Sequence, residues 1–159
     1  MTDNVTIREA RLDDADIIAQ FNCALSRETE DGELDLATVT RGVTRFLQGA
    51  GAGFYTVAEV DGRVVGCLMI THEWSDWRDG NLWWIQSVYV LPEARRRGVF
   101  RALFNGVYRS AEADPDVRGI RLYVERDNER AQRTYESFGM TQKPYRIYEI
   151  LVDSASSEA

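Results

Sequence analysis

The 159-residue chain is short of histidine and cysteine, and this narrows the chemistry that it can perform. It has one histidine, His72, so a multi-histidine metal site is excluded and a catalytic triad would depend on that single imidazole. Its two cysteines, Cys23 and Cys67, lie far apart in apolar segments and form no C-x-x-C spacing. We therefore expect two buried, reduced thiols and no metal site.

Long apolar runs are also missing, and we expect no N-terminal signal peptide. No stretch approaches the roughly 18 apolar residues that are needed to cross a membrane, and the N-terminus lacks the basic-then-apolar layout of a signal peptide. We therefore expect a cytoplasmic protein that does not use a membrane. The length of 159 residues and the 44% hydrophobic share fit one domain over residues 1–153, followed by a flexible polar tail over residues 154–159.

A basic excess is missing too, which argues against nucleic-acid binding because that binding depends on many phosphate contacts. The net charge of −7 is unevenly spread. Residues 1–94 carry 16 acidic and seven basic side chains, whereas residues 95–159 carry 10 acidic and 12 basic ones. Several arginines occur before any acid intervenes: Arg95, Arg96, Arg97, Arg101 and Arg109. This cluster predicts one local anion site, and the acidic first half would suit a cationic partner.

The spacing of apolar residues predicts a mixed α/β fold. Helices are expected over residues 13–25, 35–47, 99–112 and 128–138, and strands over residues 5–9, 54–60, 63–71, 82–90, 120–124 and 145–152. The dipeptide Asp61-Gly62 favours a type I′ turn, and hence a hairpin between the second and third strands. Residues 72–81 are polar and predict a loop, while Trp83 and Trp84 are expected in the core or on the sheet face. This order indicates a mixed sheet covered by helices.

Residues 88–103 carry the most informative pattern, because a strand runs into an arginine-rich turn and then into a helix. The first amides of a helix have no partner within it, so they attract anions. Gly98 has no side chain, so an anion can approach the backbone amides of the turn. Arginines at this end of a helix oppose its dipole unless a multiply charged anion lies between them. The pattern predicts a phosphate site, with a solvated basic turn as the alternative.

This turn and a second motif further along the chain resemble the GCN5-related N-acetyltransferase (GNAT) superfamily. The first motif is Arg95-x-x-Gly98-x-Phe100. The second motif reads Asn128-x-x-Ala131-x-x-x-Tyr135-x-x-Phe138-Gly139-Met140. The resemblance spans roughly residues 5–151. It implies a central mixed, mostly antiparallel sheet of six to seven strands flanked by about four helices, with acetyl-CoA as the acyl donor and no metal.

The resemblance also assigns roles to residues of this chain. It implies that the turn holds the pyrophosphate of acetyl-CoA and that the preceding strand pairs with its pantetheine arm. The implied binding residues are Val88, Tyr89, Val90, Arg95, Arg96, Arg97, Gly98, Val99, Phe100, Arg101 and Asn128. Phe100 departs from the family pattern, which has a small residue there, and could shift the turn. Tyr135 is the implied general acid, although its spacing from Ala131 and Phe138 is by itself more typical of a core tyrosine.

The general base is not identified by the sequence. The central strand, residues 84–88, has no carboxylate. The candidates are a water relay and four side chains: Glu28, Glu30, His72 and Glu73. A covalent route through either cysteine would lack a recognisable base nearby.

We therefore expect an N-acetyltransferase that moves an acetyl group from acetyl-CoA to a primary amine by direct attack. Acidic residues gather near the junction of the first two helices and after the hairpin: Glu28, Glu30, Asp31, Glu33, Asp35, Glu73, Asp76 and Asp79. They would suit a small cationic amine or a peptide N-terminus as acceptor, unless they serve only solubility. The alternative function is a non-catalytic acyl-CoA-binding regulatory module. The oligomeric state stays open, a homodimer included.

Overall fold

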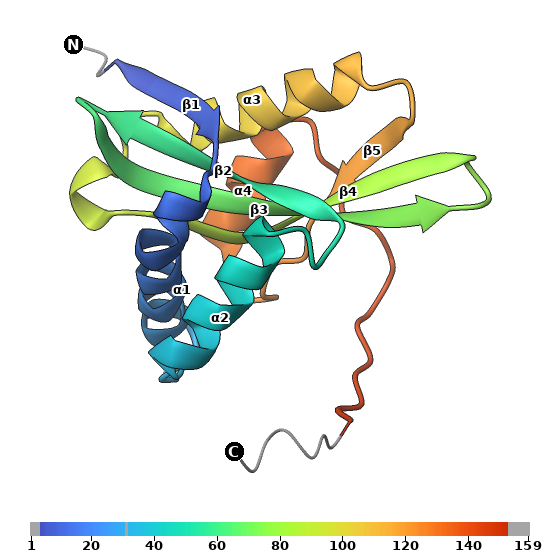
Figure 1. The fold of residues 1–159 in the computed structure, drawn as a ribbon. Coiled ribbons are helices and arrows are strands. Elements are labelled where there is room, and N and C mark those ends of the chain that lie inside the picture. The colour runs from blue at the N-terminus through green and yellow to red at the C-terminus, as the bar shows by residue number, and fades with distance from the viewer. Residues whose placement is uncertain (1–3, 31, 153–159) are drawn as a thin grey trace. The chain divides into compact units, whose positions relative to one another are not determined.

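The computed structural model describes residues 4–30 and 32–152. Their helices and strands (Figure 1) follow the order β1 (Val5–Glu9), α1 (Ala15–Thr29), α2 (Leu36–Leu47), β2 (Gly53–Val60), β3 (Arg63–Ser75), β4 (Gly80–Val90), α3 (Val99–Ala113), β5 (Val117–Arg121) and α4 (Glu129–Ser137). Short 3₁₀ turns precede α1 and follow β4. The chain forms two compact units, the first ending at Leu122 and the second beginning at Tyr123. The polar tail expected over residues 154–159 lies outside the described residues.

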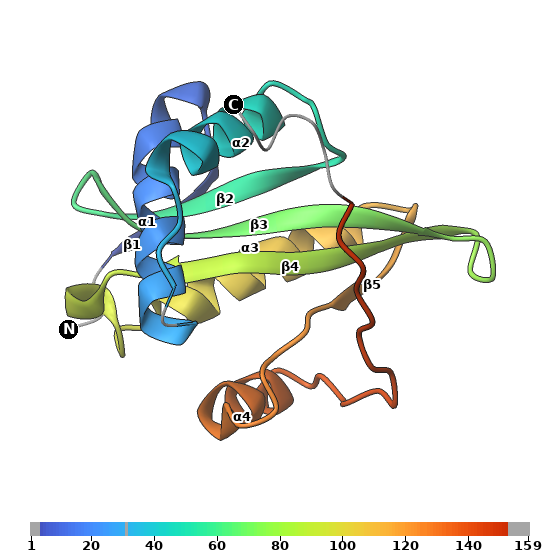
Figure 2. The same cartoon turned by 90° about the horizontal axis from the view of Figure 1, so that it is seen from below.

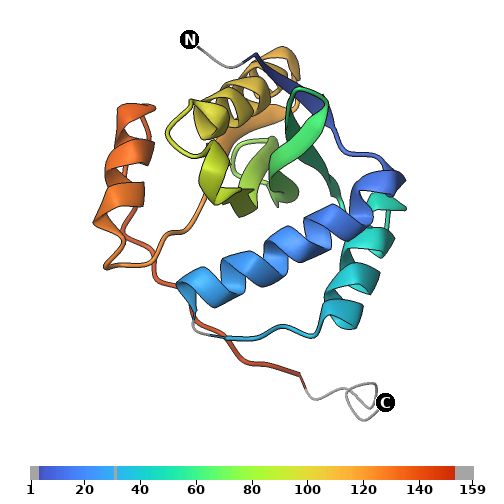
Figure 3. The ribbon, with the colours of Figure 1, turned by 90° about the vertical axis from the view of Figure 1, so that its left-hand side faces the viewer.

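The first unit is built on one sheet with the spatial order β1-β2-β3-β4-β5. The first four strands are antiparallel, and β5 runs parallel to β4. α1 and α2 lie on one face of this sheet and α3 lies on the other (Figures 1 and 3). The expected mixed sheet flanked by helices is therefore confirmed, with five strands in the described chain instead of six to seven. No described helix is long and apolar enough to cross a membrane.

Residues 145–152 do not form the strand that their pattern predicts. Their backbone has no regular structure, and Tyr148 and Ile150 are 94% and 91% exposed. A strand needs a neighbouring backbone with which to pair. Among the described residues of the second unit, α4 is the only helix or strand. The prediction of this strand is wrong. Alternating side chains show which residues would share a face of a strand, but they do not show whether a neighbouring strand is present to pair with it.

The β3–β4 hairpin is longer than predicted, so the expected loop over residues 72–81 is also wrong. β3 continues to Ser75 and β4 begins at Gly80, and only a tight turn separates them. Across the pair, the ring of His72 stacks on that of Trp83, with centroids 5.7 Å apart and planes inclined by 6°. Trp83 is buried, as expected. Such cross-strand pairs keep a polar stretch in the sheet.

Several local signals are confirmed. Asp61 and Gly62 both have positive φ, 51° and 77°, as a type I′ turn between β2 and β3 requires. Asp35 is the N-cap of α2, where its carboxylate accepts a hydrogen bond from the Thr38 amide at 3.0 Å. In the second unit, Gly139 follows α4 with a φ of 89°, which suits a residue without a side chain.

Buried apolar side chains fix α1 to the sheet, which this helix crosses in Figure 2. Ile18 and Phe21 of α1 are at most 2% exposed and share one buried cluster with Val57 of β2 and Cys67 of β3. The Phe21 ring also lies 5.3 Å from that of Tyr89 on β4. Because burying one such side chain contributes about 1.5–3 kcal/mol, this cluster holds α1 firmly beside β4.

A charged cluster joins β1, β2 and the chain just before α1. Arg8 donates to Asp14 at 2.8 and 3.0 Å and to Glu59 at 2.9 Å. The Asp14 carboxylate also accepts from the Arg11 amide at 2.7 Å. The hydrogen bond from Arg8 is the main cause of a lowered pKa of Asp14, whose side chain is 9% exposed.

We predict that Asp14→Asn lowers the free energy of unfolding at neutral pH by about 1–2 kcal/mol, because the Arg8 guanidinium loses one of its two charged partners and keeps only Glu59. The folded-state pKa of Asp14 is lowered, so its contribution is present above the ordinary pKa of about 4 and is lost as pH falls through the lowered value. Urea unfolding at neutral and acidic pH measures both effects. Asp13→Asn, at an exposed neighbouring residue, is the control; equal destabilisation by the two substitutions would contradict the prediction.

Candidate functional site

β4 and β5 separate halfway along β4. They pair only as far as Trp84. Beyond it, residues 85–90 have none of the five described strands on that side. Ser87 has a positive φ of 52°, and the β3–β4 register shifts opposite it, so a β-bulge bends β4 there. Residues 88–90, the expected partners of the pantetheine arm, therefore lie on a strand with an open hydrogen-bonding edge.

The arginine-rich turn leads from this open edge into α3. Arg96 and Gly98 have positive φ, 63° and 79°, and all four residues from Arg95 to Gly98 are exposed. Gly98 is the N-cap of α3, and no described side chain caps this helix end. A Cβ added to Gly98 would meet no atom within 4 Å, so the space beside the turn is open. Uncapped amides and exposed guanidinium groups together make a site that fits an anion.

Phe100, the residue that departs from the family pattern, does not cover this turn with its side chain. Val99 is buried in the core, and Phe100 is half-buried, with its ring centroid 6.5 Å from that of Phe104 on the next turn of α3. Gly98 stays exposed, and so does Arg101 in the first turn of the helix. The large side chain therefore packs along its own helix and leaves the backbone of the turn accessible.

An ion pair that the sequence did not indicate joins this turn to α1. Arg95 Nη2 donates to Glu28 Oε2 at 2.8 Å, and Arg95 Nε donates to the Val90 carbonyl at 2.9 Å. The Tyr89 hydroxyl donates to Glu28 Oε1 at 3.4 Å. Burial, and next the negative charge of Glu28, raise the pKa of Tyr89. Two residues that were assigned to different ligands, Arg95 to the acyl donor and Glu28 to the acceptor, thus bind each other.

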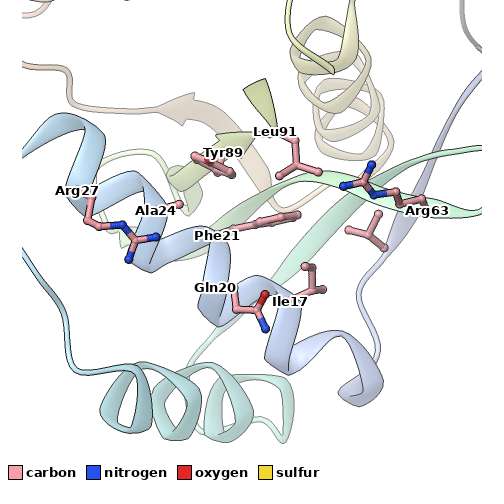
Figure 4. Close-up of a pocket in the computed structure, with 9 residues that line it drawn as sticks. Ile17, Gln20, Phe21, Ala24, Arg27, Arg63, Tyr89 and Leu91 are labelled. Carbon is pink, nitrogen blue, oxygen red and sulfur yellow. The ribbon is translucent and has the colours of Figure 1, made fainter. Parts of the chain in front are cut away.

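A groove of about 520 Å³ lies between α1 and the end of β4 (Figure 4). Its walls are mainly apolar, and Phe21 and Tyr89 contribute aromatic surface. Arg27 from α1 and Arg63 from the start of β3 approach it from opposite sides in the figure. None of the described residues that line it is acidic. No sequence motif predicted this groove, because its residues come from separate elements.

The remaining candidate bases lie at different places in the first unit. Glu73 and His72 are on β3 opposite Leu82 and Trp83, where β4 still pairs with β5. Glu73 accepts a hydrogen bond from Arg121 at 3.0 Å. Along β4, Leu82 is about 23 Å from Tyr89, at roughly 3.3 Å per residue. Glu73 therefore does not share a site with Glu28. Glu30 is exposed at the end of α1, and Asp31 lies outside the described residues.

The second unit carries the other motif residues on α4. Asn128 is the N-cap of this helix, where its Oδ1 accepts from the Ala131 amide at 3.1 Å. Tyr135 is half-buried, and burial raises the pKa of its hydroxyl. A tyrosine with a raised pKa keeps its proton at neutral pH, as a general acid must. The roles of Asn128 and Tyr135 toward an acyl donor stay predictions.

Both cysteines are buried free thiols, as expected. Burial raises the pKa of Cys67 to about 12, so almost no thiolate forms at neutral pH. This argues against Cys67 as a nucleophile. Within residues 4–30 and 32–152, no group of three or more acidic, histidine or cysteine side chains could hold a metal ion.

Comparison with known structures places this architecture among acetyltransferases. A possible acetyltransferase from Clostridium difficile 630 is 48% identical, with a TM-score of 0.88 over 94% of this chain and 99% of its own. The ribosomal-protein-alanine N-acetyltransferase of Brucella melitensis biovar Abortus 2308 shares the fold at 20% identity, with a TM-score of 0.74 over 94% and 99% of the two chains. An aminoglycoside N-acetyltransferase solved in complex with CoA does so at 17% identity, with a TM-score of 0.73 over 95% and 97%.

No curated protein gives a significant match to the chain. The model of the acetyltransferase (GNAT) family matches residues 18–140, which include the open half of β4, the arginine-rich turn and α4. Together with the fold and the 48% identical structure, this match shows that the chain belongs to the GNAT family of acetyltransferases.

Proposed function

We propose that the protein is an N-acetyltransferase that moves the acetyl group of acetyl-CoA to a primary amine by direct attack. The observation that carries this proposal is the open edge of β4 running into an uncapped helix N-terminus rich in arginine. An extended amide chain can pair with such an edge, and a pyrophosphate fits the helix end that follows it. The similar fold solved with CoA supports this choice of donor.

The residues of the turn suit the phosphates of the donor. The amides at the start of α3 and the exposed side chains of Arg96, Arg97 and Arg101 supply donors and positive charge. Gly98 leaves room for the anion. Acetyl-CoA supplies an activated thioester when it is bound, so the chain has to hold it, orient it and move protons.

The backbone of β4 and the Tyr135 hydroxyl would carry the chemical step. A primary amine is mostly protonated at neutral pH, since such groups titrate around 8 to 10.4, so it must lose a proton before it attacks. An amide of residues 88–90 would stabilise the oxygen that becomes negative in this attack. Tyr135 would donate its proton to the sulfur that leaves.

For the general base, we compare the hydrogen bonds that the three candidate carboxylates already accept. Glu28 and Glu73 already accept hydrogen bonds from Arg95 and Arg121. No ion pair to Glu30 occurs in the part of the chain that the structure describes. We therefore take Glu30, directly or through water, as the proposed base, because a carboxylate already held by a guanidinium is less available to a proton.

An assay of thiol release from acetyl-CoA against amines, polyamines, amino acids and peptides tests the function. Acetylated product with at least one amine, at a rate well above hydrolysis, is the expected result. CoA binding without transfer to any amine would favour the acyl-CoA-binding regulatory module instead.

We predict that Gly98→Glu weakens CoA binding by about a hundredfold or more, because a carboxylate then lies close to the pyrophosphate. Gly98→Ala is the matched control. It adds the same strain at positive φ without charge or close contacts, and should weaken binding less than about tenfold. Calorimetry measures both variants. Equal affinity of the Glu variant and the wild type would refute the assignment of the turn.

We also predict that Tyr135→Phe lowers kcat by about 10²-fold or more while the Kd of acetyl-CoA stays nearly unchanged, since a general acid acts only in the chemical step. Burial raises the pKa of Tyr135 above its usual value of 10, so the phenol stays protonated across the physiological range. No fall in kcat below about pH 10 should therefore come from this group. Wild-type turnover in the variant would make Tyr135 a core residue.

For the acceptor, we predict a cationic amine or peptide N-terminus whose kcat/KM falls as salt rises. Glu30→Gln should lower that kcat/KM further, because it removes both a charge and the proposed base. Glu112→Gln, exposed on α3, is the control for net charge. If the kinetics of the acceptor respond neither to salt nor to Glu30→Gln, the acidic residues around Glu30 play no role in binding or deprotonating the acceptor.

A further inference from the structure

The guanidinium of Arg95 is held on three sides. Its Nε donates to the Val90 carbonyl at 2.9 Å and its Nη2 donates to Glu28 at 2.8 Å. Its central carbon lies 5.5 Å from the centroid of the Tyr89 ring, within the range of a cation–π contact. One planar group therefore contacts the end of β4 and the last turn of α1 at the same time.

The carbonyl that Arg95 binds belongs to the open edge of β4. The Leu91 amide donates to the Val65 carbonyl on β3, and Val90 is paired with Gly66 in the same ladder. Alternate residues of an antiparallel strand bond to the same neighbour. The backbone groups of Val90 therefore point to the opposite side, where β5 no longer pairs, and Arg95 closes the end of that edge.

This arrangement leaves Arg95 poorly placed to bind a phosphate as well. Nε and Nη2 form an edge of the guanidinium that can grip an anion with two parallel hydrogen bonds. A carbonyl and a carboxylate already occupy that edge. Moving the side chain to a phosphate would break all three contacts and leave the Glu28 carboxylate uncompensated near the incoming anion.

We propose that Glu28 and Arg95 act as a positioning pair, which sets the pyrophosphate turn against the open edge of β4. The inference rests on the proposed function and deepens it. Arg95 begins the turn that ends at Gly98, so fixing its side chain to β4 and α1 restricts the backbone that presents the helix amides. Such restriction before binding raises affinity because less order is lost on binding. Glu28 then serves the acyl-donor side and not the deprotonation of the acceptor.

Glu28→Gln tests the pair, with Glu93→Gln as the matched control. Glu93 binds Arg63 at 3.1 Å, lies close to the same turn in sequence, and loses the same single charge, but its pair is 65% and 57% exposed. We expect Glu28→Gln to raise the Kd of CoA about five- to tenfold by calorimetry. Glu93→Gln should leave it within about twofold. At saturating acetyl-CoA, the kcat and acceptor KM of Glu28→Gln should stay within about twofold of wild type.

Substitution of the arginine separates positioning from phosphate binding. Arg95→Gln should weaken CoA binding at least as much as Glu28→Gln does, and the double variant Glu28→Gln/Arg95→Gln no more than Arg95→Gln alone, because the contact with Glu28 is already lost in that variant. Arg95→Lys should also weaken it, since an ammonium lacks the planar fork that bridges two acceptors. Circular dichroism and thermal unfolding establish that each variant is folded, as the 43% and 40% exposure of the two side chains leads us to expect.

Two results would contradict the proposed positioning role of Glu28 and Arg95 while leaving the proposed function intact. Equal or tighter CoA binding by Glu28→Gln would mean that Glu28 competes with phosphate for Arg95. A lowered kcat with an unchanged Kd of CoA would return Glu28 to the role of general base. Wild-type protein that binds no CoA would instead overturn the proposed function, and this inference with it.

Discussion

The site depends on the loss of pairing between β4 and β5 beyond Trp84. A strand edge inside a sheet normally finds a neighbour, because unpaired backbone groups are costly away from water. Here the bulge at Ser87 bends β4, and the cluster around Phe21 packs α1 against Tyr89 in the unpaired half of the strand. The fold therefore keeps one strand half-paired. That edge can accept an extended ligand without any displacement of another strand.

The charges near this edge include Arg95, which is paired with Glu28, and neighbouring arginines of the turn that are exposed. Glu28 neutralises Arg95 at the base of the turn, whereas Arg96 and Gly98 take left-handed conformations that open the helix end. Repulsion among clustered guanidinium groups is thereby reduced without filling the anion site. The same pair brings α1 into contact with the turn.

Local chemistry explains what the sequence could predict. The Asp61-Gly62 turn, the cap at Asp35 and the glycine before α3 each depend on neighbours within a few residues, and the structure has all three. The pair of Glu28 and Arg95 is 67 residues apart in the chain, so no periodicity reports it. The predictions of a loop over residues 72–81 and of a strand over residues 145–152 were wrong for the same reason, because both depend on distant parts of the chain. Whether a polar or apolar stretch becomes a strand is decided by the partner that tertiary structure provides.

The burial of Tyr135 affects how readily its hydroxyl could donate a proton to a leaving thiolate. A thiol has an ordinary pKa of about 8.5 and a phenol one of about 10, so in water the transfer of a proton from tyrosine to thiolate is uphill. Raising the pKa of Tyr135 further makes it a weaker acid. Desolvation, however, disfavours the charged form of both groups, so a thiolate expelled into the same poorly solvated space becomes more basic as well. In the proposed reaction, Tyr135 would then be matched to the thiolate as an acid only when the thiolate forms, which would tie proton transfer to cleavage of the thioester.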